Sequence, residues 1–351
     1  MCNIAGYAGN RSAAPILVEM LRAQEDYDGG MSTGVATIHE GKLYHRRVVG
    51  DVDTLLRETD VLDLPGTIGI AHSRPGGAVA GKALYPCLSN DKASALVVNG
   101  TLLGLATRYD RHESVLRELE AAGYEFVTAH EPVRRSTTIS DGRAVMNPEI
   151  RVLRMEDLLK QGMAPADAMA RMSTELYKDN ATVFLSTHFP DSIFALRISR
   201  PLVSVMDHGE TYLATTRFAM PKHLQERAVV LPLSHACELR RDGVTVHPAR
   251  IEEEPVCEIT PFMYAEGYRF LEERLRSADA PLDFDSIGFR KGIADLWPEK
   301  HDVTQAAHLL YELLYQFEQE GRLHREKQPR ERIKRDGTVV PYRRWCFSLS
   351  E

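Results

Sequence analysis

Short strand-forming segments are concentrated in two separate stretches of the chain, and this arrangement most constrains the fold. The second stretch runs from Ala181 to Val246, where apolar runs alternate with turn signals such as Asp207-His208-Gly209. Helical periodicity lies between the two stretches. The strands expected in the first stretch are Cys2 to Ala8, Thr33 to Ile38, Lys42 to Val49, Thr67 to Ala71 and Ser94 to Val98. The pattern predicts an α+β fold with two packed sheets and helical layers outside them.

The chain has 351 residues, which exceeds the size at which one hydrophobic core usually stops growing. The strand signal ends near Ile251, and the acidic run 252–255 that follows is a plausible boundary. A helix is expected to start at Thr260-Pro261, and a strong amphipathic helix covers Thr304 to Glu320. Two strand-like segments follow that helix. We therefore predict two domains, residues 2–250 and a smaller, mostly helical, winged-helix-like domain of residues 251–351.

Composition excludes several classes of protein. The chain carries 43 Lys and Arg against 50 Asp and Glu, a net charge of −7, which argues against a nucleic-acid footprint over the whole protein. No apolar stretch is long enough for a membrane helix, and we expect no membrane partner. The five cysteines are scattered, with no C-x-x-C pair, and the histidines have no metal-ligand spacing. We expect a cytoplasmic protein with no metal and no cofactor.

Cys2 follows the initiator methionine directly. Removal of Met1 would place an α-amine and a thiol on one residue. Their reference pKa values, about 8 and about 8.5, suit a general base and its nucleophile near neutral pH. The thiolate could then attack a carbonyl without help from a histidine.

Three further motifs could complete an amide-cleaving site. A predicted strand ends in His72-Ser73-Arg74, where an arginine can hold a carboxylate with two parallel hydrogen bonds. Asn99-Gly100 follows another strand; taken alone it is first of all a hairpin signal, but the same geometry can also present two donors of an oxyanion hole. Asp141, in the Ser140-Asp141-Gly142 segment, could bind an ammonium group or form a turn.

These residues resemble the motifs of class II glutamine amidotransferases, which use an N-terminal nucleophile. The chain begins Met-Cys-Asn-Ile-Ala-Gly, close to the family's Met-Cys-Gly-Ile-x-Gly. Residues 71–74 are similar to the family's Gly-His-Thr-Arg, and Asn99-Gly100 to its Asn-Gly. The segments 28–36 and 191–216 also match in order and approximate spacing. The resemblance covers residues 2–250. This part of the chain is similar to the glutaminase domain of glucosamine-6-phosphate synthase, and we expect no synthase domain after it.

The resemblance implies a four-layer αββα N-terminal nucleophile hydrolase sandwich and glutamine as the substrate. It assigns Cys2 as the nucleophile, with Asn99 and the Gly100 N–H as the oxyanion hole. It implies that Arg74 holds the α-carboxylate of glutamine and Asp141 its α-amine. Gly76 and Gly77 would form a mobile flap over the substrate. His72 is counted with the substrate-binding residues, as a hydrogen-bonded residue below that flap.

Four departures from the family bear on efficiency and on the route of ammonia. Asn3 replaces a glycine beside the nucleophile, and Asp28 and Met31 stand where the family has Arg and Asp. Pro75 follows Arg74 where sugar-utilising members often carry an aromatic residue.

The leading functional hypothesis is an enzyme that hydrolyses glutamine through a Cys2 thioester and supplies ammonia to a separate acceptor-binding partner. One alternative is hydrolysis of another γ-glutamyl amide on the same fold. A second alternative is a glutamine-sensing regulator. In that case the basic run 322–345 of the C-terminal module would bind nucleic acid or an acidic partner. The alternative interpretation of this run is a solvent-exposed wing or loop with no binding role. A homo-oligomer is compatible with each of the three hypotheses.

Overall fold

The computed structural model describes residues 2–75, 85–100, 109–132, 137–251, 257–297, 304–333 and 339–350. Two sheets account for the part of the chain up to Arg250. The first sheet contains β1 (Asn3–Ala8), β2 (Ser32–His39), β3 (Lys42–Val48), β4 (Ile68–Arg74), β9 (Val203–Asp207), β10 (Glu210–Ala214) and β11 (Val229–Val230). The second sheet contains β5 (Cys87–Leu88), β6 (Ser94–Gly100), β7 (Asn180–Ser186), β8 (Ile193–Arg197), β12 (His235–Arg240) and β13 (Gly243–Arg250).

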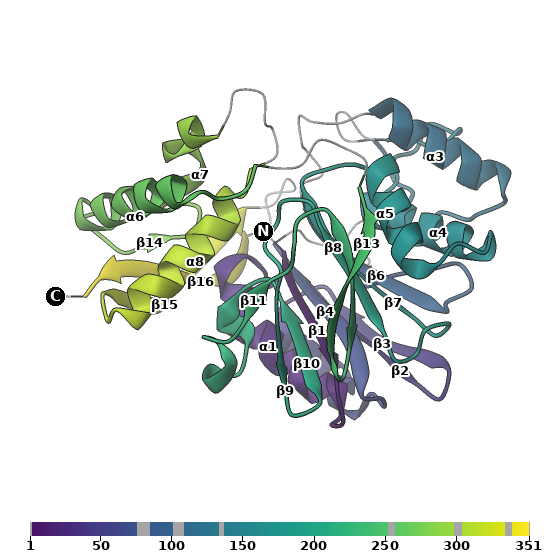
Figure 1. Cartoon of the computed structure of the whole chain (residues 1–351), viewed down its shortest axis with the longest axis horizontal. Coiled ribbons are helices and arrows are strands. Elements are labelled where there is room, and N and C mark those ends of the chain that lie inside the picture. Colours follow the sequence, from purple (N-terminus) through teal and green to yellow (C-terminus); the bar gives the residue numbers. More distant parts are fainter. Residues whose placement is uncertain are drawn as a thin grey trace.

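The two sheets stack face to face, and helices cover both outer sides (Figure 1). The strand orders are β11-β9-β10-β1-β4-β2-β3 and β13-β12-β8-β7-β6-β5. The helices in this part of the chain are α1 (Ala13–Asp28), α2 (Val52–Glu58), α3 (Tyr109–Ala121), α4 (Asn147–Lys160) and α5 (Pro165–Glu175). Of these, α1 packs on the first sheet, and α4 and α5 pack on the second.

Strand β1 shows why the strands at the centre of the sandwich read as continuous apolar runs. Ile4 and Ala8 belong to the core between the sheets, whereas Ala5 and Tyr7 belong to the core under α1. Since side chains alternate along a strand, a strand covered on both faces must be apolar at nearly every position. The predicted αββα sandwich is therefore confirmed.

Two local features differ from what the sequence pattern indicated, each for an identifiable reason. Asn99-Gly100 is not a hairpin turn, because β6 runs through both residues and pairs with β7 up to Gly100 opposite Asn180. Helix α4 was not predicted at all. Its sequence hides the apolar stripe, since Glu149, Arg151 and Arg154 are buried along with its apolar side chains.

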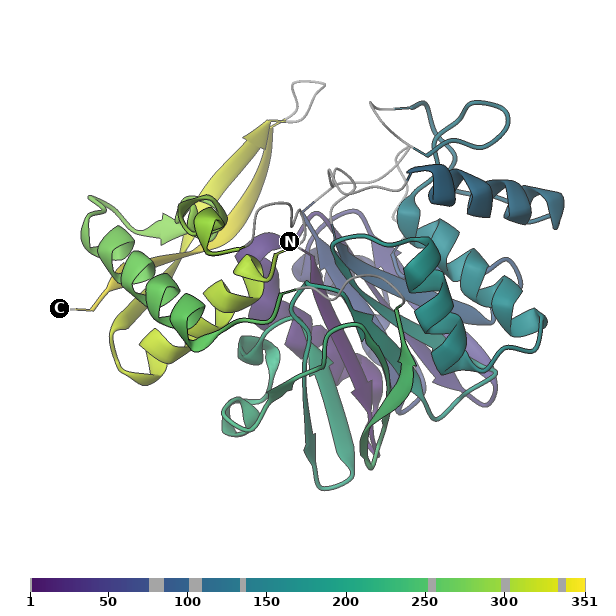
Figure 2. The same cartoon turned by 45° about the horizontal axis from the view of Figure 1, so that its top comes forward.

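The C-terminal part combines helices with a three-stranded sheet. Its elements are α6 (Pro261–Arg276), β14 (Leu282–Asp283), α7 (Phe289–Gly292), α8 (Ala306–Gln319), β15 (Leu323–Ile333) and β16 (Val339–Leu349). Thr260 caps α6, as expected, by accepting a hydrogen bond from the Met263 N–H at 3.2 Å. The sheet order is β14-β16-β15, and the β15–β16 hairpin projects from the body of the molecule (Figure 2). The winged-helix-like assignment of this part stays a prediction.

Helix α8 of the C-terminal part packs against the sandwich. Only Gln319 of its residues is exposed, and its apolar side chains share a core with Tyr27 of α1 and with Phe218. Glu312 of α8 forms an ion pair with Arg217 at 2.8 Å. The C-terminal part is thus packed against the sandwich through α8, while the boundary at residue 250 stays a prediction.

A buried ion pair joins the ends of the chain. The Arg344 guanidinium on β16 lies 2.5 Å from the carboxylate of Asp28, the last residue of α1, and both side chains are less than a tenth exposed. Removing one partner of a buried pair leaves the other charge without its compensation. We therefore expect Arg344→Ala to lower the free energy of unfolding by about 3 kcal/mol, measured by urea denaturation.

The neighbouring residue provides a matched control for that experiment. Arg343 is exposed, so Arg343→Ala should change the free energy of unfolding by less than about 0.5 kcal/mol. The double variant Asp28→Asn/Arg344→Met should be more stable than Arg344→Ala alone, since no buried charge remains. Equal stability of Arg344→Ala and the wild type would contradict the structural role given to this pair.

Candidate active site

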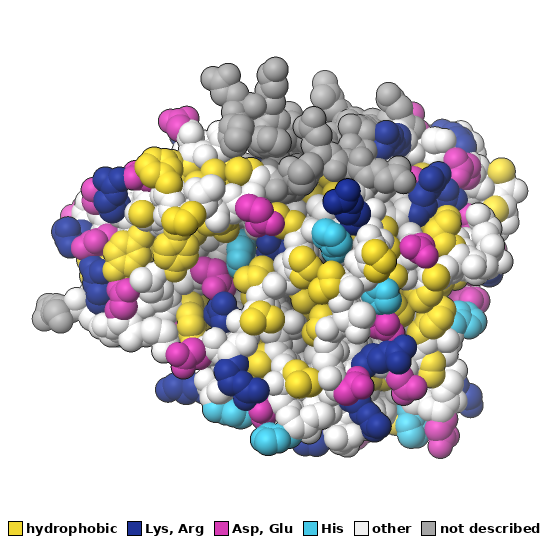
Figure 3. Space-filling model, viewed as in Figure 1, with side chains coloured by type: hydrophobic (Ala, Val, Ile, Leu, Met, Phe, Trp, Pro, Cys, Tyr) yellow, Lys and Arg dark blue, Asp and Glu magenta, His cyan; other side chains and the backbone are white. Residues whose placement is uncertain are grey.

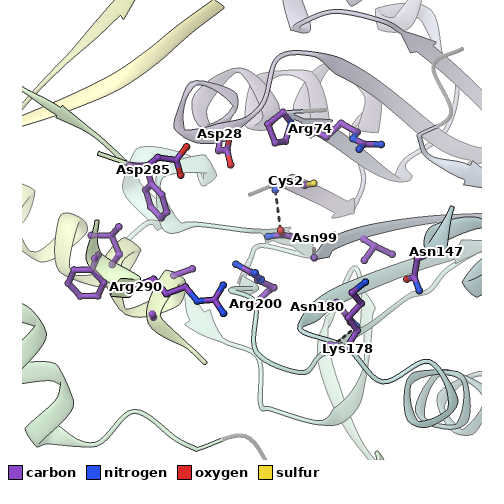
Figure 4. A pocket seen from close by; sticks show the side chains of 18 of the residues that line it. Cys2, Asp28, Arg74, Asn99, Asn147, Lys178, Asn180, Arg200, Asp285 and Arg290 are labelled. Carbon is purple, nitrogen blue, oxygen red and sulfur yellow. Dashed lines mark hydrogen bonds between the residues drawn. The ribbon is translucent and has the colours of Figure 1, made fainter. Parts of the chain in front are cut away.

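Cys2 opens into a cavity of about 650 Å³ that is lined by both parts of the chain (Figure 4). The sandwich contributes the ends of β1, β4 and β6 and the start of β7. The C-terminal part contributes Phe284, Asp285 and residues of α7 and α8. The volume falls within the range of pockets that bury small-molecule ligands, about 300–1,000 Å³.

Asn99 lies directly beside Cys2 and keeps one donor available. The Cys2 backbone nitrogen donates to Asn99 Oδ1 at 3.1 Å. Asn99 Nδ2 is buried and has no hydrogen-bond partner within the described ranges. A buried amide donor is costly to leave unpaired, so a position beside the thiol where it can bind a developing oxyanion is a chemically reasonable use of it.

Gly100 continues β6 at the cavity wall. A Cβ added there would lie 2.6 Å from the Asp179 carbonyl oxygen and 2.8 Å from Asn180 Cβ, so no larger residue fits without a shift of the backbone. The two residues of the predicted oxyanion hole are thus brought next to the predicted nucleophile.

Arg74 reaches the same cavity from β4. The antiparallel pairing of β1 and β4 places Ser73 opposite Asn3, so Arg74 lies at the level of Cys2. Its guanidinium stacks over the ring of Tyr85, 4.8 Å from the centroid. Tyr85 was not predicted as a site residue. It supplies an aromatic wall to the cavity from a different segment of the chain.

His72 is buried behind this wall. Its ring stacks on Tyr85 with centroids 4.6 Å apart, and Nε2 lies 3.1 Å from the Val98 carbonyl oxygen, which links β4 to β6. Burial, and secondarily the Arg74 charge, lower the pKa of His72 to about 3. The ring is therefore neutral at physiological pH and donates from Nε2. It supports the wall rather than facing the cavity as an acid or base.

Asp141 is not brought to this site. Its side chain is exposed on a turn before α4 and pairs with Arg143 at 2.6 Å, and it does not line the cavity. Helix α4 contributes Asn147, an amide rather than a carboxylate, and Pro148 to the cavity. The predicted flap residues Gly76 and Gly77 lie outside the described residues.

Two cations that the sandwich contributes to the cavity wall were also missed, as were Arg290 and Lys291 of α7. Lys178 precedes β7, and Arg200 follows β8. Arg200 pairs with Asp179 at 2.5 Å. The signal for Lys178 and Arg200 was their position next to strand ends. Because β6, β7 and β8 are neighbours in one sheet, residues at these strand ends can lie near Asn99. This signal could be used only once the strand pairing was known. In the parts of the chain with described coordinates, no cluster of His, Cys, Asp or Glu could hold a metal ion, and no helix could cross a membrane.

Comparisons with known proteins identify relatives of this chain. No protein-family model matches the chain. It is 30% identical over 260 residues to a glutamine–fructose-6-phosphate aminotransferase of Zymomonas mobilis, covering 73% of this chain and 38% of that protein. It is 31% identical over 248 residues to the Pseudomonas aeruginosa enzyme of the same name, covering 70% and 36%. The chain thus spans little more than a third of these relatives.

Solved structures show the same fold. The Bacillus subtilis glutamine PRPP amidotransferase superposes with a TM-score of 0.57 at 15% identity, over 84% of this chain and 64% of that one. A structure of the allosteric regulatory enzyme of purine biosynthesis gives 0.56 at 16% identity, over 83% and 63%.

The fold is that of an N-terminal nucleophile hydrolase domain. The predicted resemblance is confirmed. The chain carries a class II glutamine amidotransferase domain, similar to the glutaminase part of glutamine–fructose-6-phosphate aminotransferases. Class II glutamine amidotransferases are enzymes.

Proposed function

We propose that the chain hydrolyses the side-chain amide of glutamine to glutamate and ammonia through a thioester on Cys2. The observation that carries this proposal is the contact of Cys2 with Asn99, which accepts from the Cys2 nitrogen through Oδ1 and whose amide donor Nδ2 has no partner among the described residues. After removal of Met1 the Cys2 nitrogen becomes an α-amine, which can accept the thiol proton.

The proposed reaction forms a thioester on Cys2 and then hydrolyses it. The thiolate of Cys2 adds to the amide carbon, and Asn99 Nδ2 and the Gly100 N–H stabilise the oxyanion. The carbon–nitrogen bond breaks as the protonated α-amine gives its proton to the leaving ammonia. Water then adds to the thioester, and glutamate leaves as the thiol is restored. Arg74 binds the substrate carboxylate in a bidentate manner, with two parallel hydrogen bonds.

The recognition of the α-amine separates two candidate substrates. Asp141 points to solvent, and the described acids of the cavity wall are Asp28, which pairs with Arg344, and Asp285. This favours, as a second candidate, an amide substrate that keeps the carboxylate but lacks a free α-ammonium group.

Parallel assays with L-glutamine and with glutaric acid monoamide, which lacks the amine, test both candidates. We expect equimolar ammonia and glutamate from glutamine, and one adduct on Cys2, with Met1 absent, after treatment with a diazoketone analogue of glutamine. Cleavage of the monoamide alone would replace glutamine by the second candidate. Release of ammonia from neither amide would overturn the proposed function.

The acceptor of ammonia is proposed to be bound by a separate partner protein, in a reducing compartment such as the cytoplasm. All five cysteines are free, which supports that compartment. Whether the chain forms a homo-oligomer stays a prediction.

The nucleic-acid hypothesis for residues 322–345 has little support. Arg322, Arg325 and Lys327 pair with Glu272, Glu318 and Asp26, and α8, the helix that a winged helix would place in a groove, is covered. On the face shown in Figure 3, acidic and basic side chains are mixed.

A further inference from the structure

Asn147, the first residue of α4, presents an amide of fixed orientation to the cavity beside Cys2. Arg151, one turn further along α4, donates from Nε to Asn147 Oδ1 at 2.7 Å. A guanidinium has only donors, so the oxygen of the Asn147 amide must be the atom that faces Arg151. The Nδ2 group of Asn147 has no hydrogen-bond partner among the described residues. Asn147 therefore offers a donor, and not an acceptor, to a substrate in the cavity.

Arg151 holds this orientation because its own side chain is fixed inside the sandwich. It is fully buried, its Nη1 lies 3.2 Å from Met172 Sδ, and its Nη2 donates to the Leu176 carbonyl oxygen. Burial lowers the pKa of Arg151 to about 9, so the guanidinium is still charged at neutral pH. The three groups that it contacts are neutral. A positive charge thus lies directly behind the Asn147 amide, where it disfavours an ammonium group in the cavity.

The wall that carries Asn147 continues from the proposed oxyanion hole. Gly100 of β6 pairs with Asn180 of β7, and Asn180 Nδ2 donates to the Lys178 carbonyl oxygen at 2.8 Å. The charge of Arg151, after burial, contributes to the lowered pKa of Lys178, so these two side chains are near one another. Arg151 in turn bonds to Asn147. Apart from Arg151, all of these residues line the cavity.

The described acids of the cavity lie away from Asn147. They are Asp28, which pairs with Arg344, and Asp285. In Figure 4 both acids lie on one side of Cys2 and Asn147 lies on the other. A substrate ammonium near Asn147 would therefore meet an amide donor instead of a carboxylate. The cavity, at about 650 Å³, is large for glutamine alone, so a group attached to the α-nitrogen has room.

We propose that Asn147 determines substrate specificity by donating to an acyl carbonyl oxygen on the α-nitrogen of the substrate, so that the site prefers α-N-acylated glutamine to free glutamine. This inference rests on the proposed amide hydrolysis at Cys2 and names its substrate class. Acylation removes the positive charge that the wall disfavours and supplies the acceptor that Asn147 Nδ2 lacks. The chemistry at Cys2 is unchanged: the side-chain carbon–nitrogen bond breaks, water hydrolyses the thioester, and the products are ammonia and N-acylated glutamate.

Ammonia release by the full chain from L-glutamine, N-acetyl-L-glutamine and glutaric acid monoamide tests this inference. The three compounds share the side-chain amide and the carboxylate, and they differ only in the substituent on the α-carbon. We expect kcat/KM for N-acetylglutamine to exceed the value for each of the other two about tenfold or more, mainly through a lower KM. An equal or higher kcat/KM for glutamine or for the monoamide would overturn this inference and leave the proposed hydrolysis intact.

Asn147→Asp tests the donor with little change in shape. One carboxylate oxygen can still accept from Arg151 while the other replaces the donor, so kcat/KM for N-acetylglutamine should fall about tenfold relative to the value for glutamine. Asn10→Asp, the same change at an exposed asparagine outside the cavity, is the matched control and should alter this ratio less than twofold. An unchanged ratio in Asn147→Asp would contradict contact between Asn147 and the substrate.

Binding separates failure of this inference from failure of the proposed hydrolysis. If none of the three amides releases ammonia, the proposed function is wrong, and calorimetry on full-length Cys2→Ala then decides the specificity. This variant cannot form the thioester, and we expect it to bind N-acetylglutamine about tenfold more tightly than glutamine. Equal or tighter binding of glutamine would overturn the role given to Asn147.

Discussion

Cys2→Ala should lower the rate of glutamine hydrolysis by about 10⁴-fold or more, because no other group in the proposed mechanism can form the thioester. The thiol is half-buried at the cavity wall, so its replacement by a smaller side chain should leave the fold intact. The measurement is ammonia release at saturating glutamine, with thermal unfolding as the check on folding. Cys2→Ser should also be inactive, since a hydroxyl is far less acidic than a thiol.

Two controls make this result specific to the nucleophile. Cys257→Ala changes a half-buried cysteine that does not line the cavity, and it should retain wild-type activity. A form that keeps Met1 through an uncleaved N-terminal tag should be inactive with Cys2 present, because its Cys2 nitrogen is an amide and cannot act as a base. More than a tenth of wild-type activity in Cys2→Ala would place the nucleophile elsewhere.

Asn99→Ala should lower kcat by about 10²- to 10³-fold with little change in KM. The reason is that Asn99 Nδ2, which has no partner among the described residues, is expected to bind the oxygen only as it becomes an oxyanion. An interaction made only in the transition state lowers kcat and kcat/KM together. Asn99→Asp should be impaired at least as strongly, since it replaces the donor by a negative charge.

The integrity of the nucleophile can be followed separately in the Asn99 variants. Alkylation of Cys2 by iodoacetamide should proceed at nearly the wild-type rate if the site remains folded. Asn10→Ala, at an exposed asparagine outside the cavity, is the matched control and should leave kcat unchanged. A rise in KM with an unchanged kcat would instead assign Asn99 to ground-state binding and remove it from the oxyanion hole.

The strand motifs could be read from the sequence because each concentrates its chemistry at a strand end. Cys2 and Arg74 lie at the ends of β1 and β4, and those strands are recognisable as short apolar runs. The Asn99-Gly100 pair was ambiguous for a local reason, since the same dipeptide forms hairpin turns. Only the pairing of β6 with β7 through Gly100 decided in favour of a strand that reaches the site.

Asp141 shows where residue type and order were insufficient. An acid was expected near the end of this segment, and the local sequence offered Asp141. The structure pairs it with Arg143, two positions along the chain, and directs Asn147 of α4 to the cavity instead. Helix α4 itself was hidden because its buried charged residues interrupt the apolar periodicity on which the prediction depends.

By itself, the sequence predicted the two-sheet fold and placed Cys2, Arg74 and Asn99 together as candidates, because short-range patterns specify strands and the motifs lie where strands begin or end. The tertiary structure alone decided how the cavity is completed. Lys178, Arg200 and Arg290 meet there from separate segments, and the Asp28–Arg344 pair that fastens the C-terminal part spans 316 positions. Such contacts depend on which elements pack together, and no local pattern of residues records that choice.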